Sequence, residues 1–463
     1  MGDSKMTRRR FVRGTVATAL AGLSAPSLRA AQVRRLSGAN DRIRLGIVGP
    51  GIRGRTLVSW IQQLAVSENV AISAVCDIWH TRREALADEL DARNNLKVHR
   101  CHRMEEACSL KDVDALVIAT PDFQHAPQTR QAVEAGKDVY VEKPFGCDFE
   151  QIRLARDAVL RTGRIVQHGT QRRGQGIPWA ARDFVRSGRL GKVSFVEITQ
   201  ALFHQRWRIP SSESTLTAND TDWGEFLSYT PQVPFNSRHY LEYRLFWPYS
   251  TGIFCQWMSH AIDLVNLVLG ERPKSVVAAG GVYVWSDGRT NPDTVQCLVE
   301  YPSGCMVSYH MRLGNGANGR WVTFYGTRGT LDLEAGMAYG DGGGGEVVLR
   351  NPGASIPEFV IDGARRLPGF DRGGVLLDAE PDRDHMADFF AAVRSRRRPR
   401  APIESAFDQA VATTMAGMSL RMGAKVSYDP VADAVFPTHA QWDRMQQAAR
   451  ERRDSATHGD DPT

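Results

Sequence analysis

Lys143 and His260 are the two side chains whose setting best suits proton-transfer chemistry. Lys143 belongs to a Glu142-Lys143-Pro144 motif at the end of an expected parallel strand, the edge where ligands bind in such sheets. Oxidation of an alcohol needs a group that takes the hydroxyl proton while hydride leaves the carbon, and a lysine with a lowered pKa or a histidine can do this. Taken alone, the motif is equally compatible with a solvated surface lysine.

His260 lies in the segment Gly252–Asp263, which is expected to be helical. A helix would place Gln256 and His260 on one face because they are four residues apart. In that arrangement His260 is a candidate proton acceptor, and Gln256 is a candidate partner that orients the imidazole through a hydrogen bond. A structural histidine in the core is the alternative, and this segment alone favours it.

A glycine-rich turn, Gly49-Pro50-Gly51-Ile52-Arg53-Gly54, is the candidate nucleotide site because it follows an expected strand and opens an expected helix. In this pattern the first glycine permits the tight turn, and the second lets the backbone approach a pyrophosphate. The third allows close helix–strand packing, and the helix N-terminus offers amides to the phosphates. A glycine turn that serves only packing is the alternative interpretation.

Asp77 ends the next expected strand and completes the nucleotide pattern. Its carboxylate can accept hydrogen bonds from both ribose hydroxyls and would repel a 2′-phosphate. NAD is therefore the expected cofactor, and NADP the less favoured one, although the nearby Arg82 and Arg83 keep NADP open.

The elements that must position these residues indicate an α/β fold of two domains. Strands alternate with helices over residues 41–170, which is typical of a Rossmann domain with a doubly wound parallel sheet. Long β-type runs joined by hairpin signals then indicate a second α/β domain, residues 171–430, with an open, mostly antiparallel sheet. Helices expected within residues 384–422 would return to the first domain.

The two ends of the chain differ in composition from the rest. Residues 1–31 contain the run Thr7-Arg8-Arg9-Arg10-Phe11, then a short apolar stretch and small residues, which together predict a twin-arginine export signal and a periplasmic or exported protein. The alternative is a basic disordered tail. Residues 451–463 are polar and expected to be disordered.

Charge and cysteine usage exclude several other classes of protein. The net charge is +6, but the first thirty residues hold six basic residues and one acidic residue, so the remainder is nearly neutral and predicts no nucleic-acid partner. The seven cysteines include no CxxC pair, and buried free thiols are expected. The scattered histidines frame no metal site, and no Gly-x-Ser-x-Gly elbow occurs.

The motifs taken together and in order resemble the Gfo/Idh/MocA family, which includes glucose–fructose oxidoreductase and inositol 2-dehydrogenase. They are Gly49–Gly54, Ala119-Thr120-Pro121 with His125, Ala135-Gly136-Lys137 leading to Glu142-Lys143-Pro144, and Gly252–Asp263. The resemblance covers about residues 42 to 430, and the Glu-Lys-Pro motif is its most specific part.

The resemblance implies roles for individual residues. Lys143 would be the catalytic lysine, joined to Pro144 by a cis peptide bond, and His260 the catalytic acid–base. Thr120, Pro121 and His125 would line the nicotinamide end of the cofactor site, with Glu142 and Lys143 beside them. The open sheet commonly forms the oligomer contact in this family, so a homo-oligomer through that sheet is expected.

One departure from the family pattern concerns Gln256, where many members have Asp. A neutral amide can orient an imidazole but cannot stabilise an imidazolium by charge. We therefore expect His260 to be a weaker base, or Lys143 to carry a larger share of the chemistry. The departure also leaves room for altered or lost activity.

The expected substrate is a carbohydrate. Arg172, Arg173, Trp207 and Trp257 are its candidate contacts, because aromatic faces and planar polar groups suit sugars, although interdomain salt bridges and ordinary core aromatics would explain them equally well. The sequence predicts an NAD-dependent oxidoreductase that acts on a secondary hydroxyl of a sugar or glycoside, with a tightly bound cofactor. The alternatives are a glycosidase that uses bound NAD for transient oxidation, and a sugar-binding protein without turnover.

Overall fold

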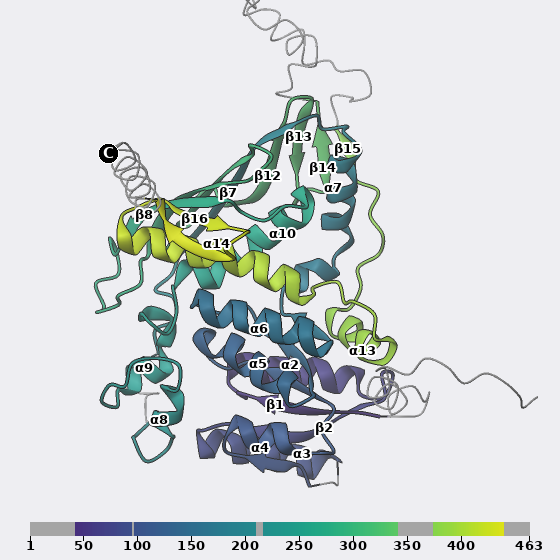
Figure 1. The fold of residues 1–463 in the computed structure, drawn as a ribbon, viewed down its shortest axis with the longest axis vertical. Coiled ribbons are helices and arrows are strands. Elements are labelled where there is room, and N and C mark those ends of the chain that lie inside the picture. The colour runs from purple at the N-terminus through teal and green to yellow at the C-terminus, as the bar shows by residue number, and fades with distance from the viewer. Residues whose placement is uncertain (1–41, 95–96, 210–215, 341–373, 439–463) are drawn as a thin grey trace, which may run out of the picture. The chain divides into compact units, whose positions relative to one another are not determined.

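The computed structural model describes residues 42–94, 97–209, 216–340 and 374–438 (Figure 1). The expected export signal over residues 1–31 and the expected disordered tail over residues 451–463 lie outside them. Within the described ranges, no helix has the length and apolar character needed to cross a membrane.

The first domain is built on a six-stranded parallel sheet with the order β3-β2-β1-β4-β5-β6. Its strands are β1 Ile43–Val48, β2 Val70–Cys76, β3 His99–Cys101, β4 Ala115–Ile118, β5 Asp138–Val141 and β6 Val166–His168. The strand order reverses between β1 and β4, and the crevice at that point binds ligands in sheets of this kind. The expected Rossmann architecture is confirmed.

The helices of the first domain are α2 Ile52–Leu64, α3 His80–Asn94, α4 Met104–Ser109, α5 His125–Glu134 and α6 Phe149–Thr162. Helix α6 shows how the sequence sets the ends of a helix. The carboxylate of Asp148 caps it by accepting a hydrogen bond from the Gln151 amide, and Gly163 ends it at a φ of 64°. Helix α4 was not predicted, because its six residues are too few for a periodic apolar pattern.

The second domain holds a large sheet with the order β15-β14-β13-β12-β7-β10-β9-β8-β16-β17, and β11 pairs with β7. The long strands are β7 Val193–Phe203, β8 Ser275–Gly281, β9 Thr294–Glu300, β10 Met306–Arg312 and β12 Arg320–Gly326. The shorter ones are β11 Gly314–Asn315, β13 Gly329–Asp332, β14 Met337–Tyr339, β15 Val375–Leu376, β16 Val426–Asp429 and β17 Ala434–Pro437. Only β7 and β10 pair in parallel among the described strands of this sheet, which confirms a mostly antiparallel sheet.

Helices α7 Gly176–Arg186, α10 Ser259–Leu269 and α14 Ile403–Met422 lie along one face of the large sheet, and α14 also contacts α6 of the first domain (Figure 1). Helix α13 His385–Ser395 contacts the first domain as well, where the Gln167 amide donates to the His385 carbonyl at 2.5 Å. The segment Gly252–Asp263, which is expected to be helical, is not a regular α-helix, because Phe254–Met258 form a π-helical turn before α10.

A covering segment, residues 216–250, leaves the large sheet and packs on the first domain. It contains α8 Trp223–Phe226 and α9 Ser237–Leu241 (Figure 1). Thr221 forms a β-bridge with Trp79, and the Gln124 amide donates to the Phe226 carbonyl at 3.0 Å. A separate apolar cluster, which includes Phe123 and Phe226, fills the space beneath the segment.

Arg173 ties the domain junction to α10 and is not placed to bind substrate. Its Nε donates to both carboxylate oxygens of Asp263 at 2.9 Å, and both side chains are almost fully buried. Of the two predicted arginines, Arg173 therefore forms a structural salt bridge, and its prediction as a substrate contact is wrong.

We expect Arg173→Ala to lower the free energy of unfolding by about 3–5 kcal/mol, because it leaves the Asp263 carboxylate buried and unpaired. The double variant Arg173→Met/Asp263→Leu should recover much of that loss. Arg161→Ala, which removes an exposed arginine paired with Glu134, is the control and should change stability by less than about 0.5 kcal/mol. Denaturant unfolding of the three variants measures this, and equal losses in Arg173→Ala and Arg161→Ala would contradict it.

Candidate active site

The glycine-rich turn has the shape that a dinucleotide pyrophosphate requires. Gly49 has a φ of +79°, and a Cβ on Gly54 would lie 2.3 Å from the carbonyl oxygen of Gly49, so neither position accepts a side chain. A Cβ on Gly51 would be in ordinary contact only with Arg82. Gly51 instead lines a cavity with Gly49, Ile52 and Arg53, which leaves its backbone open to a ligand.

Asp77 lies in the same cavity, at the end of β2. One of its oxygens accepts a hydrogen bond from the Trp79 amide at 2.8 Å, and burial raises the pKa of the carboxyl. Arg82 also lines the cavity and stacks on the Trp79 ring, whereas Arg83 is paired with Glu84. The arrangement suits a ribose at Asp77, and it leaves Arg82 within the nucleotide cavity.

The covering segment closes this nucleotide cavity from the side of the second domain. Phe226, Tyr240, Tyr243 and Arg244 line it opposite the glycine-rich turn. Tyr243 and Arg244 belong to an aromatic and basic stretch, and nothing local in such a stretch predicts which distant surface it covers.

The cavity continues past Thr120 into a second one of about 250 Å³, which contains the catalytic candidates. His125 is buried, and its two ring nitrogens lie 2.6 Å from the Pro144 carbonyl oxygen and 2.8 Å from that of Thr120. Burial lowers the pKa of His125, whereas the two carbonyl acceptors raise it, because only a ring with an N–H on each nitrogen donates to both. The Lys143–Pro144 bond is cis, as expected from the resemblance.

Lys143 meets Gln256 rather than a carboxylate. Its Nζ donates to the backbone carbonyl of Gln256 at 3.1 Å and to the side-chain Oε1 at 3.2 Å. The amide nitrogen of Gln256 then donates to Oδ2 of Asp122 at 2.5 Å. The expectation that Gln256 orients His260 is therefore wrong, because both ends of its amide are bonded elsewhere. The π-helical turn changes the helical register on which that expectation depended.

Asp122 is a candidate site residue that the sequence patterns did not predict. It is buried at the end of the loop after β4, where it also accepts a hydrogen bond from Ser250 at 2.6 Å. Its position directly after Thr120-Pro121 was the available signal, but only the fold brings this carboxylate to Gln256. The chain thus places a negative charge one amide away from Lys143, whereas many relatives are expected to have it at position 256.

The surroundings of Lys143 lower its pKa to about 8. Burial is the main cause, because an ammonium group loses hydration. The carboxylates of Asp122 and Glu142 oppose this by stabilising the charged form. A lysine with this pKa exchanges protons readily near neutral pH.

His260 lines the same cavity, and no hydrogen bond to its ring is formed within the described part of the chain. Burial lowers the pKa of His260 well below its ordinary value, and the positive charges of Lys143 and Arg172 lower it further. The imidazole is therefore neutral, and its ring nitrogens are free to bond a ligand.

Glu142 and Arg53 form an ion pair at the boundary of the nucleotide and catalytic cavities. The Oε1 atom of Glu142 lies 2.7 Å from Arg53, and Gln171 donates to the same oxygen at 3.0 Å. Both residues were predicted to bind the cofactor. Arg53 lines both cavities, but Glu142 already balances its charge.

A third cavity, of about 350 Å³, adjoins Lys143 and His260 on the side of the second domain. The predicted substrate residues Arg172, Trp207 and Trp257 all line it. This substrate cavity is of a size that suits a small ligand, and its aromatic walls flank the two catalytic candidates.

The described residues contain one group that could hold a metal ion, although the sequence predicts none. Ligand atoms of Asp122, Cys147 and Cys255 all lie within 4.8 Å of one another. The two sulfur atoms are 3.5 Å apart, and their mutual hydrogen bond and burial raise the pKa of Cys147. A thiol that keeps its proton is a poor ligand, so these residues suit core packing better than metal binding.

Two family models match the chain. Residues 43–170 match an oxidoreductase family with an NAD-binding Rossmann fold, Gfo/Idh/MocA, and residues 179–332 match the C-terminal domain of that family. Inositol 2-dehydrogenase of Rhizobium meliloti is 27% identical over 298 residues, 63% of this chain and 76% of that protein.

Two further similarities support less: one covers a short part of the chain, and the other has low sequence identity. A glycosyl hydrolase family 109 protein of Shewanella baltica is 29% identical over 126 residues, 26% of this chain and 27% of that protein. The crystal structure of the WlbA dehydrogenase of Bordetella pertussis with NADH and UDP-GlcNAcA has a TM-score of 0.58 at 17% identity. That similarity covers 84% of this chain and 99% of WlbA, and it shows the fold alone. The two family models together match more than half of the sequence, and the chain belongs to the Gfo/Idh/MocA family of oxidoreductases with an NAD-binding Rossmann fold.

Proposed function

We propose that the protein is an NAD-dependent dehydrogenase that oxidises a secondary hydroxyl of a sugar or glycoside. The meeting of Lys143 and His260 carries the proposal: one comes from the first domain and the other from the second, and both line the cavity that adjoins the glycine-rich turn. The dehydrogenases among the relatives and the structural neighbours support it.

The residues present fit a dinucleotide. Gly49, Gly51 and the start of α2 would hold the pyrophosphate, Asp77 the ribose hydroxyls, and Thr120 the nicotinamide end. When bound, the nicotinamide ring accepts the hydride that leaves the substrate carbon.

Lys143 is the proposed base for the hydroxyl proton. In its neutral form the amine takes this proton while the carbon–hydrogen bond breaks, and the product carbonyl and an ammonium group remain. Asp122, acting through the Gln256 amide, stabilises that ammonium group. The neutral His260 offers a hydrogen bond that positions the same hydroxyl.

We further propose that the protein is exported and keeps its nucleotide. The twin-arginine pattern supports export, and closure of the nucleotide cavity by Phe226 and Tyr240 supports slow release. The exposed apolar side chains of Val277, Leu298 and Met306 on the large sheet support a homo-oligomer.

A glycosidase that uses bound NAD is the second candidate. The match to a glycosyl hydrolase family 109 protein favours it, but that match covers only 26% of this chain. Such an enzyme would need the same Lys143 chemistry to oxidise its substrate transiently.

Incubation of the protein with NAD and a panel of sugars and glycosides should yield NADH and an equal amount of ketone product. The absorbance of NADH and the mass of the sugar product measure the two. Cleavage of the glycosidic bond without net NADH would favour the glycosidase. Absence of both products across the panel would contradict the proposal and favour a sugar-binding protein.

The rate of sugar oxidation should rise with pH through about 8, because Lys143 accepts a proton only when neutral and its neutral fraction grows above its pKa. Lys143→Met should lower kcat about 10²- to 10⁴-fold and abolish this rise. Asp122→Asn removes the charge that favours the ammonium form, so it should shift the rise to lower pH. Profiles of kcat/KM measure all three, and an unchanged profile in Lys143→Met would exclude Lys143 as the base.

Asp77→Ala should weaken NAD binding about 10-fold or more, because two hydrogen bonds from ribose hydroxyls to a charged acceptor are lost. NADP binding should weaken less or improve, since the repulsion of a 2′-phosphate is removed while Arg82 remains. Titration calorimetry with both nucleotides measures the change, and Asp88→Ala, an exposed carboxylate on α3, is the control. An unchanged NAD affinity would remove Asp77 from the site.

A further inference from the structure

The substrate cavity is rich in positive charge, and none of the described residues that line it is acidic. Its eight lining residues include Lys143, Arg172 and Arg206, together with His260, and none of them is Asp or Glu. A neutral sugar would need no such excess of charge. The remaining lining residues are Gln171, Trp207, Gln256 and Trp257, which suit the hydroxyls and the C–H face of a sugar ring.

Arg206 differs from its neighbours because no acidic side chain in the described ranges forms an ion pair with it. Arg208, two residues further on, pairs with Glu242 at 3.1 Å, and Arg172 pairs with Glu334. Arg206 instead stacks over the Trp257 ring, with its guanidinium carbon 5.2 Å from the ring centroid. Its Nε is buried and has no hydrogen-bond partner among the described residues. A buried guanidinium nitrogen that has no partner is costly unless a ligand accepts its hydrogen bond.

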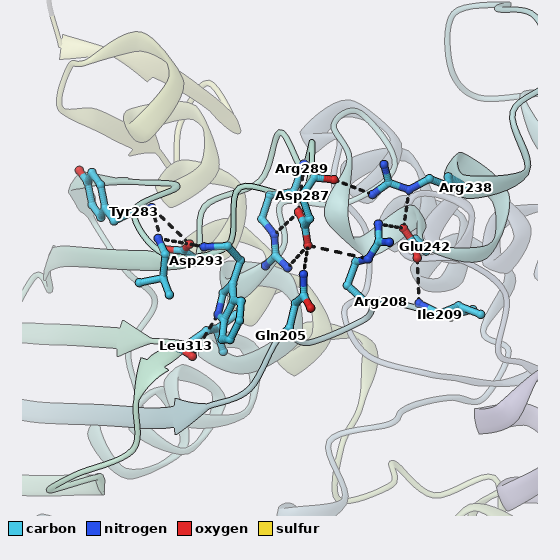
Figure 2. Close-up of polar contacts among 12 residues, drawn as sticks. Gln205, Arg208, Ile209, Arg238, Glu242, Tyr283, Asp287, Arg289, Asp293 and Leu313 are labelled. Carbon is cyan, nitrogen blue, oxygen red and sulfur yellow. Dashed lines mark hydrogen bonds and ion pairs between the residues drawn. The ribbon is translucent and has the colours of Figure 1, made fainter. Parts of the chain in front are cut away.

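The turn that carries Arg206, residues 205–209, is fixed on both sides (Figure 2). The Gln205 amide donates to Asp287 at 3.0 Å, and Glu242 accepts hydrogen bonds from Arg208 at 3.1 Å and from the Ile209 amide at 2.8 Å. These contacts hold the backbone on either side of Arg206 and Trp207, so the two side chains at the cavity are presented by a rigid element.

Trp207 lies between the two anchors with a φ of +65°, a left-handed conformation that a tryptophan rarely adopts. Strain of this kind persists where the surrounding contacts over-determine the backbone, and it gathers at ligand sites. The anchored and strained turn is therefore typical of a ligand-binding loop and unlike an ordinary surface loop.

We propose that the substrate is an acidic sugar, whose anionic group, a carboxylate or a phosphate, pairs with Arg206. This inference rests on the proposed function, since it names the substrate class of the same site. Arg172 reinforces the attraction from the same cavity, and the rings of Trp207 and Trp257 pack on the sugar. The anion would form an ion pair with Arg206, the arginine of this turn that pairs with no acidic side chain among the described residues.

The test compares matched sugars on the full-length protein with NAD present. Glucuronate and galacturonate supply the carboxylate, glucose 6-phosphate the phosphate, and glucose and galactose the neutral counterparts. Titration calorimetry gives the affinities, and NADH formation gives kcat/KM. We expect at least one acidic sugar to bind about 10- to 100-fold more tightly than its neutral counterpart, and the better of the two anions identifies the group.

Arg206→Gln should remove this preference, and Arg206→Lys should retain part of it. Arg182→Gln, on α7 and paired with Asp183, is the matched control and should change nothing. Added salt should weaken the binding of acidic sugars by the native protein but not that of neutral ones, a readout that holds even if a variant fails to fold.

The outcomes separate this inference from the proposed function. Equal affinity for acidic and neutral sugars, or no binding of any acidic sugar, overturns the inference. Oxidation of acidic sugars at an equal rate by the native protein and Arg206→Gln does the same, while the proposed function stands. Tight binding of an acidic sugar that depends on Arg206, without NADH formation, supports the inference and counts against the proposed function.

Discussion

The contact of Lys143 with Gln256 is the constraint on which the rest of the site depends, because it joins the two domains at the point of reaction. Lys143 is fixed by the end of β5, and Gln256 by the π-helical turn before α10. The buried pair of Arg173 and Asp263 holds α10 against the domain junction further along the helix. A shift of α10 by a fraction of a helical turn would break the Lys143 contact and move His260 together with it.

The same contact lies on an electrostatic boundary. Asp122 and Glu142 face Lys143 from the first domain, whereas Arg172 and Arg206 lie on the side of the substrate. Burial favours the neutral amine, and the two carboxylates favour the ammonium, so their opposition leaves the pKa of Lys143 near 8. Burial and the nearby positive charges both lower the pKa of His260, and no carboxylate of the described residues raises it, so the ring stays neutral. Two bases in one cavity thereby acquire different protonation states from their surroundings alone.

Sequence patterns predicted the elements of the chain better than the contacts between them. The strands of the first domain and the glycine-rich turn follow from local periodicity and from the needs of a tight backbone turn. The bonding of Gln256 could not be predicted in this way, because the spacing argument assumes a regular α-helix and the π-helical turn changes the register. Asp122 and Arg206 were not predicted for a different reason. Asp122 is marked by its hydrogen bond to Gln256, more than a hundred residues away in the sequence. Arg206 is marked by the lack of an acidic partner among the described residues around the cavity.

The nucleotide cavity and the substrate cavity are both lined by residues of the segment between β7 and α10. Glu242, at the end of α9, accepts hydrogen bonds from Arg208 and Ile209 and so fixes the turn that presents Arg206 to the substrate cavity (Figure 2). The next two residues, Tyr243 and Arg244, line both the nucleotide cavity and the catalytic cavity. A displacement of α9 would therefore open the nucleotide cavity and also release the turn of residues 205–209. Because one buried carboxylate connects them, the two sites cannot be altered independently through this segment.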